Sequence, residues 1–262
     1  MDMSSAPTLP FAHPERPRAR YRPLVAWHHF RLLVKDKEAT EHVTPIFESL
    51  PWTGVYAAAE KFFASKRGQA IRASEPSLVP ILDDHETLRK LPRDTLAHAY
   101  CDFMEREGLS AQGLVDDLDR YRTHGDFGDQ VDWYFHRMRD THDLMHVLTG
   151  YGRDALGEQC VLAFTYSQQP SLAHLFLGYA GAIEIKKRVR SSAPVLRAVR
   201  EAQKLGKACP RIAEMSIREL LATPLDEVRR QLNITRPVHY WQAHRDWQAM
   251  GVDPYDLLGK AA

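Results

Sequence analysis

Two histidines four residues apart, His142 and His146, are the residues whose types and spacing best suit chemistry. Residues i and i+4 lie on one face of an α-helix, so the two imidazoles can point at one position. Asp143 lies one turn from His146 and flanks that face. Glu158 follows His146 after eleven intervening residues, beyond a turn with two glycines that can bring a second helix back alongside the first. Nitrogen and carboxylate ligands in this pattern predict a site for zinc or another divalent metal such as Fe, Mn or Co.

The alternative interpretation is structural: His142 and His146 would be ordinary, partly buried histidines, each hydrogen-bonded to a carboxylate. The combination of four candidate ligands with a turn at the right place favours the metal site. Arg139 lies one turn before His142, on the same side of the helix. It is a candidate to bind an anionic group of a substrate or to pair with Asp143, and a solvated arginine is the other possibility.

The elements that must position these residues are helices. One long helix is predicted from about Asp129 to Thr149, because apolar residues recur at steps of three and four. On a helical wheel His142 falls inside this apolar stripe and His146 on its margin. The ligands therefore border a buried face, as a site in the wall of an apolar cavity requires. A second helix is expected to start near Asp154 and to carry Glu158.

The whole sequence predicts an all-α, single-domain, multi-helix bundle with an apolar cavity. No segment shows sustained alternation of period two or hairpin turn chemistry, and 262 residues suffice for one substantial core. We expect a flexible N-terminal lead-in over residues 1–23, rich in proline and arginine, to which no site is assigned. The helical domain is predicted over residues 24–234, and residues 235–262 are expected to dock on its core.

Composition excludes several classes of function. The net charge of +1 gives no bulk electrostatic argument for binding nucleic acid. The cysteines are Cys101, Cys160 and Cys209, and they form no CxxC motif. We therefore expect neither a thiolate metal site nor a disulfide framework. We expect a reducing compartment such as the cytoplasm. No secretory signal is recognised, and the apolar stretch from Leu172 to Ile185 is too short for a transmembrane helix.

A band of basic residues follows that apolar stretch, between residues 186 and 211. Such a band beside an apolar helix suits phospholipid head groups or a phosphate. A solvated helix end is the alternative.

The motif resembles one family more closely than two others. Zinc proteases with an HExxH motif have a glutamate at the position of Asp143, and its side chain is one methylene longer. Phosphohydrolases with an adjacent His-Asp pair need further His and Asp ligands, which are not evident in this sequence. The pattern HDxxH, eleven residues and then Glu is similar to the signature of the fourth coenzyme Q biosynthesis protein family. The segments 139–150, 156–158, 91–100 and 225–230 resemble that family as well, and the similarity spans residues 24 to 234.

The resemblance implies that His142, Asp143, His146 and Glu158 bind a divalent metal, first of all zinc. It also implies an all-helical fold, a cavity for a polyprenyl chain and peripheral association with a membrane, on its inner face if the source is bacterial. The implied role is in ubiquinone synthesis, both organising the other biosynthetic enzymes and replacing the ring carboxyl group by a hydroxyl.

Our leading hypothesis is a lyase-type, metal-dependent oxidative decarboxylation of a prenylated precursor derived from 4-hydroxybenzoate. An open metal position would polarise the carboxylate or phenolate oxygen, and Arg139 would hold its charge. The competing hypothesis is a non-catalytic scaffold that binds an isoprenoid lipid, in which four protein ligands close the shell of a structural metal. A metal-dependent hydrolase is a third possibility, and a homodimer is compatible with each.

Overall fold

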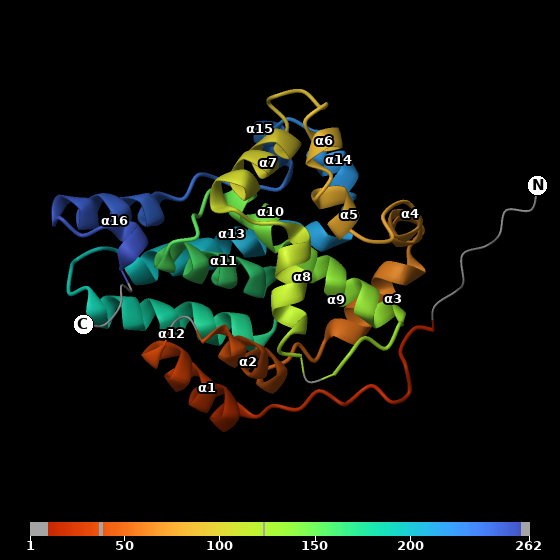
Figure 1. Cartoon of the computed structure of the whole chain (residues 1–262), viewed down its shortest axis with the longest axis horizontal. Coiled ribbons are helices and arrows are strands. Elements are labelled where there is room, and N and C mark those ends of the chain that lie inside the picture. Colours follow the sequence, from red (N-terminus) through yellow and green to blue (C-terminus); the bar gives the residue numbers. More distant parts are fainter. Residues whose placement is uncertain (1–9, 37–38, 123, 258–262) are drawn as a thin grey trace, which may run out of the picture.

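The chain folds into helices, without a β-strand among the residues that the structure describes, which are 10–36, 39–122 and 124–257 (Figure 1). The structure is a computed structural model. Extended pairing in this part of the chain is limited to one isolated bridge between Thr95 and Pro224. The prediction of an all-α fold is confirmed.

The first half of the chain forms shorter helices. They are α1 (Pro23–Lys35), α2 (Val43–Ser49), α3 (Val55–Ala64), α4 (Lys66–Ser74), α5 (Val79–Leu82), α6 (His85–Leu88), α7 (Leu96–Glu107) and α8 (Ala111–Asp119). A turn of 3-10 helix, Thr40–His42, precedes α2.

The second half contains the remaining helices, including the three longest. They are α9 (Gln130–Asp140), α10 (His142–Thr149), α11 (Ala155–Gln168), α12 (Leu172–Arg188), α13 (Val195–Ala208), α14 (Ile217–Leu221), α15 (Leu225–Gln231) and α16 (Val238–Ala249). Turns of 3-10 helix lie at Ile212–Glu214 and Pro254–Asp256.

Helix α11 lies at the centre and packs against both α12 and α13 (Figure 1). Its residues Cys160, Val161 and Phe164 are fully buried. Helix α13 approaches it so closely that a Cβ at Gly206 would lie 2.2 Å from the carbonyl oxygen of Phe164. Only glycine fits this contact. The helix that carries Glu158 is therefore held rigidly from two sides.

The predicted long helix from Asp129 to Thr149 is wrong in one respect, because it is two helices, α9 and α10, that meet at Thr141. Thr141 has φ −85° and ψ 0°, and its hydroxyl donates to the carbonyl of Met138 at 3.0 Å. A threonine hydroxyl bonded to the preceding turn competes with the helical ladder, which interrupts the helix. His142 is thus the first residue of α10 rather than the middle of a longer helix.

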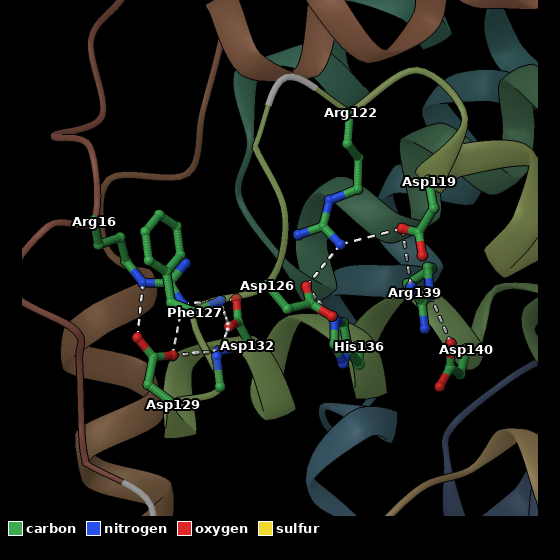
Figure 2. Close-up of polar contacts among 11 residues, drawn as sticks. Arg16, Asp119, Arg122, Asp126, Phe127, Asp129, Asp132, His136, Arg139 and Asp140 are labelled. Carbon is green, nitrogen blue, oxygen red and sulfur yellow. Dashed lines mark hydrogen bonds and ion pairs between the residues drawn. The ribbon is translucent and has the colours of Figure 1, made fainter.

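Residues 10–22, which we call the N-terminal strap, lie along the domain and lead into α1 (Figure 1). The carbonyl oxygen of Pro10 accepts from the backbone N–H of Gln130 at 2.9 Å. Arg16 pairs with Asp129 and Asp132 at the start of α9, at 2.6 Å each (Figure 2). The sequence led us to assign no site to this segment, yet the strap contacts the helix that leads to the metal-ligand candidates.

The C-terminal part also contacts the core. Helix α16 packs against α13, and its Tyr240, His244 and Trp247 are buried. The hydroxyl of Tyr240 reaches the turn between α10 and α11, where it accepts from the backbone N–H of Gly152 at 3.0 Å.

Candidate metal centre

Three of the predicted ligands come together where α10 meets the first turn of α11. One ligand atom each from His142, His146 and Glu158 lies within 4.8 Å of the others. The Nε2 atom of His146 is 3.5 Å from Oε2 of Glu158, and the two imidazole centroids are 5.0 Å apart. The helical spacing and the glycine turn thus produce the cluster that the sequence indicated.

The hydrogen bonding of His146 fits a metal ligand. Its Nδ1 lies 3.0 Å from the carbonyl oxygen of Tyr151, so Nδ1 carries the proton and Nε2 presents a lone pair. This Nε2 is buried and has no hydrogen-bond partner among the described residues. Leaving a buried polar atom unpaired costs about 1–3 kcal/mol, which a bound cation would remove. The donor set therefore fits a divalent metal.

Asp143 lies beside this cluster rather than within it. Its Oδ1 is 3.2 Å from Nδ1 of His142. Burial disfavours charge on both groups, but their mutual hydrogen bond holds the pKa of Asp143 below its ordinary value and the pKa of His142 above it. In this arrangement Asp143 orients His142, and its ligation of a metal stays a prediction.

Glu158 has a cationic neighbour that the sequence pattern did not reveal. Nε of Arg153 is 3.6 Å from Oε1 of Glu158. Burial raises the pKa of Glu158, but His146, His142 and Arg153 outweigh it and keep that pKa below the ordinary value. Glu158 is thus held as a carboxylate, the form that binds a cation.

A cavity of about 1670 Å³ adjoins the cluster, and His142, Glu158 and Arg139 lie in its wall. Residues of the strap and of α1, α2 and α12 also line it. Apolar side chains that line it include Phe30, Leu33, Phe47, Leu162, Leu177 and Ile185. The wall thus combines these apolar side chains with charged ones, among them Glu184 and Arg188 of α12.

His174 on α12 is a second residue that sequence reasoning did not place in the site. It is buried in the cavity wall, its Nδ1 has no hydrogen-bond partner among the described residues, and its ring packs edge-on against Phe47 at 4.7 Å. Burial, aided by the nearby His142, lowers the pKa of His174 to about 3. The imidazole is therefore neutral. The sequence signal that could have indicated this residue is a histidine within a mainly apolar helical segment.

Arg139 also lies in the cavity wall, and its partner is Asp140 rather than Asp143. Its Nε donates to Oδ1 of Asp140 at 2.7 Å, and Asp119 lies 4.0 Å from its Nη1 (Figure 2). Binding of an anion by Arg139 stays a prediction. The pairing with Asp143 considered from the sequence is replaced by the contact with Asp140.

A second group of potential ligands, His85, Cys101 and Glu105, is also within 4.8 Å of one another. Here the guanidinium of Arg89 donates to Glu105 at 2.8 Å and bonds Asp102 at 2.6 Å. Burial raises the pKa of the Cys101 thiol to about 11, whereas a cysteine binds metal as the thiolate. The cluster on α10 and α11 is therefore the stronger candidate for a metal centre.

Replacing Asp154 by alanine is expected to destabilise the protein by about 2–4 kcal/mol and to weaken metal binding about tenfold. Its Oδ1 caps α11 by accepting from Leu156 N and Gly157 N at 3.1 Å each, and its Oδ2 accepts from the hydroxyl of Tyr240. Glu158 lies in the turn that this cap fixes. Urea unfolding and zinc titration measure the two effects.

The matched control is Asp253→Ala, because Asp253 caps the exposed 3-10 turn by accepting from Tyr255 N at 2.9 Å. This control should cost less than about 1 kcal/mol and leave zinc binding unchanged. Equal losses in the two variants would show that Asp154 has no special part in positioning Glu158.

Replacing Arg16 by alanine is expected to loosen the strap and to lower stability by about 1–3 kcal/mol, because the carboxylates of Asp129 and Asp132 lose their cation in a partly buried place. Hydrogen exchange at the amides of Gln130 and Val131, which donate to strap carbonyls, should accelerate. The control Arg18→Ala removes an exposed arginine of the same segment and should change neither quantity. Unchanged exchange in the Arg16 variant would contradict this role.

A helical domain with a His-His-Glu cluster in the wall of a large cavity defines a class of candidate metal- and ligand-binding proteins. The chain belongs to the family of the coenzyme Q (ubiquinone) biosynthesis protein Coq4, whose model matches residues 34–238. The resemblance inferred from the HDxxH pattern is thereby confirmed.

Individual relatives are more distant. The chain is 24% identical over 188 residues to a protein from Coccidioides immitis and 25% identical over 211 residues to one from Aspergillus clavatus, both named mitochondrial ubiquinone biosynthesis protein COQ4. These matches cover 70% and 79% of this chain but 62% and 66% of the relatives, so the chain spans less than two thirds of their length.

Among solved structures, a Nostoc punctiforme protein assigned to ubiquinone biosynthesis has a similar fold. The TM-score is 0.54 with 18% identity, over 81% of this chain and 98% of that one. Among the described residues here, no helix is long and apolar enough to cross a bilayer.

Proposed function

We propose that the chain acts in ubiquinone biosynthesis by binding a prenylated aromatic precursor in its cavity, beside a divalent metal, first of all zinc, held by His142, His146 and Glu158. The observation that carries the proposal is the buried, unpartnered Nε2 of His146, directed toward Glu158 in the wall of a cavity large enough for such a ligand. Membership in the Coq4 family supports the pathway.

The proposed reaction is an oxidative decarboxylation of a precursor derived from 4-hydroxybenzoate. The aromatic acid, dioxygen and water give a phenol, CO₂ and hydrogen peroxide, so the two-electron oxidation of the substrate is matched by the two-electron reduction of dioxygen, which is the external oxidant. A metal in this site would supply Lewis acidity toward the carboxylate or phenolate oxygen.

The residues of the chain would orient the substrate for this change. Arg139 in the cavity wall would hold the carboxylate, in exchange for its present contact with Asp140. Asp143 would fix the ring of His142, and the neutral His174 would add no charge to the cavity wall. The prenyl chain would extend along the apolar residues of α1, α2 and α12.

Metal analysis of the purified protein, together with mass spectrometry of co-purifying lipid, tests the binding part of the proposal. We expect about one divalent ion per chain and an isoprenoid ligand. Conversion of a prenylated aromatic acid to the phenol tests the chemistry, and His142→Ala should abolish it. A protein that retains no stoichiometric metal, with a variant that leaves the pathway intact, would refute the mechanism.

A second candidate is a non-catalytic scaffold that binds the isoprenoid lipid and organises the other ubiquinone enzymes around a structural metal. The observation that favours it is Asp143, which lies 3.2 Å from His142 and would supply a fourth ligand after a change of rotamer. Substitution of the metal by cobalt distinguishes the catalytic proposal from the scaffold proposal. Azide should shift the visible spectrum if one position is open and leave it unchanged if the shell is closed.

We further propose that the domain works at a membrane surface, because an isoprenoid precursor resides in the bilayer. In a bacterial cell this would be the inner face of the cytoplasmic membrane, whereas the fungal relatives are named mitochondrial.

A further inference from the structure

Exposed apolar side chains are concentrated where the strap enters α1. Tyr21 is 51% exposed, Leu24 83%, Val25 37% and Trp27 52%. Large exposed hydrophobic residues are ordinary when scattered, but four within seven positions make a patch. Such a patch requires a partner.

The other face of α1 is already used by the fold. Ala26 and Phe30 are buried, and the ring of Phe30 lies 5.1 Å from that of Phe176 on α12. Leu24 and Trp27 are three residues apart on one edge of the helix, and the half-exposed ring of Trp27 also contacts Phe30 and Phe176, with centroid distances of 5.9 and 6.4 Å. The outward face of α1 is therefore fixed by the packing of its inner face.

Three arginines precede this apolar face directly. Arg18, Arg20 and Arg22 are exposed, no acidic residue occurs between residues 17 and 25, and none of the three pairs with a carboxylate of the described residues. Positive charge next to an exposed aromatic and aliphatic edge complements a surface that is anionic outside and apolar beneath.

The same arginines belong to the cavity wall. Figure 1 shows the strap running along the outer side of the domain into α1, next to α2. A surface that covers residues 18–27 would therefore lie against an edge of the cavity.

We propose that residues 18–27, which we call the docking edge, bind an anionic lipid bilayer, with Arg18, Arg20 and Arg22 meeting phosphates and Leu24 and Trp27 entering the head-group region. The inference rests on the proposed function in one respect, that an isoprenoid ligand would enter the cavity from this bilayer. It places the membrane contact at the strap rather than at the basic band of residues 186–211. Beside that band the exposed large hydrophobic residues are Ile183 at 45% and Leu196 at 37%, whereas the docking edge has four, of which Leu24 is 83% exposed.

Co-sedimentation of the full chain with vesicles tests the docking edge. The probes are vesicles of phosphatidylcholine alone and vesicles that also contain phosphatidylglycerol. Wild type should prefer the anionic vesicles and lose that preference at high salt. Combined Arg18→Gln, Arg20→Gln and Arg22→Gln should weaken the binding about 100-fold, since each basic residue is worth roughly a factor of five.

The apolar half of the docking edge is tested by combined Leu24→Ser and Trp27→Ser, which should weaken binding at least about tenfold. Two controls match the chemistry elsewhere on the surface. Combined Arg197→Gln, Arg200→Gln and Lys204→Gln on α13 removes as many exposed charges, and Val238→Ser replaces an apolar residue that is 61% exposed. Both controls should bind within about twofold of wild type.

Three outcomes would overturn the proposal. The first is that wild type does not bind anionic vesicles, and the second is that the α13 control loses as much vesicle binding as the arginine variant. The third is a dimer in light scattering that combined Leu24→Ser and Trp27→Ser dissociate without weakening vesicle binding. The last outcome would assign the edge to a second copy of the chain. Metal content and co-purifying lipid are measured on the same samples. If they are absent while vesicle binding follows the docking edge, the proposed binding of metal and isoprenoid ligand fails and the membrane contact stands.

Discussion

His146→Ala is expected to weaken zinc binding by at least about 100-fold, the largest effect of any single change on the site. Substitution of residues that merely orient ligands costs 10–100-fold, and His146 offers a lone pair that is already aimed at the cluster. In wild type, zinc at about 100 times its Kd should raise the free energy of unfolding by about 2.7 kcal/mol. In the variant this stabilisation should vanish. Isothermal titration and urea unfolding with and without zinc measure both quantities.

The matched control is His98→Ala, because His98 is a partly buried helical histidine whose Nε2 bonds the carbonyl oxygen of Leu91 at 2.8 Å, away from the cluster. This variant should bind zinc as wild type does. Wild-type zinc affinity in the His146 variant would show that the cluster on α10 and α11 holds no metal.

Glu75→Ala is expected to destabilise the protein by about 3–5 kcal/mol, because it leaves a buried guanidinium without its counter-ion. Glu75 is fully buried and accepts from Nη2 of Arg137 at 2.6 Å, and Arg137 itself is 2% exposed. Glu75 also accepts from the Ser216 hydroxyl and from the first N–H groups of α14. Loss of this carboxylate would detach α4 and α9 from α14. Urea unfolding at neutral pH measures the cost.

Two variants show whether the charge pair is the cause. Combined Glu75→Gln and Arg137→Met should cost less than Glu75→Ala, because no isolated charge stays buried. Glu86→Ala, which breaks an exposed pair with Lys90, should cost less than about 0.5 kcal/mol. If Glu75→Ala resembled this surface control, the pair would have no structural importance.

The same carboxylate should make stability depend on pH. Burial alone would raise the pKa of Glu75, but bonds from Ser216, from the backbone of Arg218 and from Arg137 hold it below the ordinary value. The unfolded chain therefore binds this proton more readily than the folded one. The contribution of Glu75 is fully present above the ordinary glutamate pKa and is lost as pH falls through the lowered one. Urea midpoints across acid pH should fall less steeply for Glu75→Gln.

Much of the metal-ligand cluster could be predicted from the sequence because it depends on local spacing. The i, i+4 relation of His142 and His146 and the cap at Asp154 act within one or two helical turns. The all-α fold could also be predicted, because the helical period of apolar residues can be recognised in the sequence without knowledge of tertiary contacts.

Other parts of the site depend on contacts that no local pattern encodes. Tyr151 contributes a backbone carbonyl, which every residue possesses. The partner of Arg16 lies more than a hundred positions away. The break at Thr141 required knowing that its hydroxyl bonds Met138, since threonine is tolerated within helices. Sequence therefore indicated the ligands, and packing determined their surroundings.

The contact of Tyr240 with the cap of α11 has a consequence for biosynthesis of the protein itself. Asp154 receives the Tyr240 hydroxyl and His244 from a helix that is translated more than eighty residues later. Until α16 emerges from the ribosome, the first turn of α11 lacks these partners, and Glu158 lacks its final support. We therefore expect that the proposed metal would bind the nascent chain late, only after α16 has been translated.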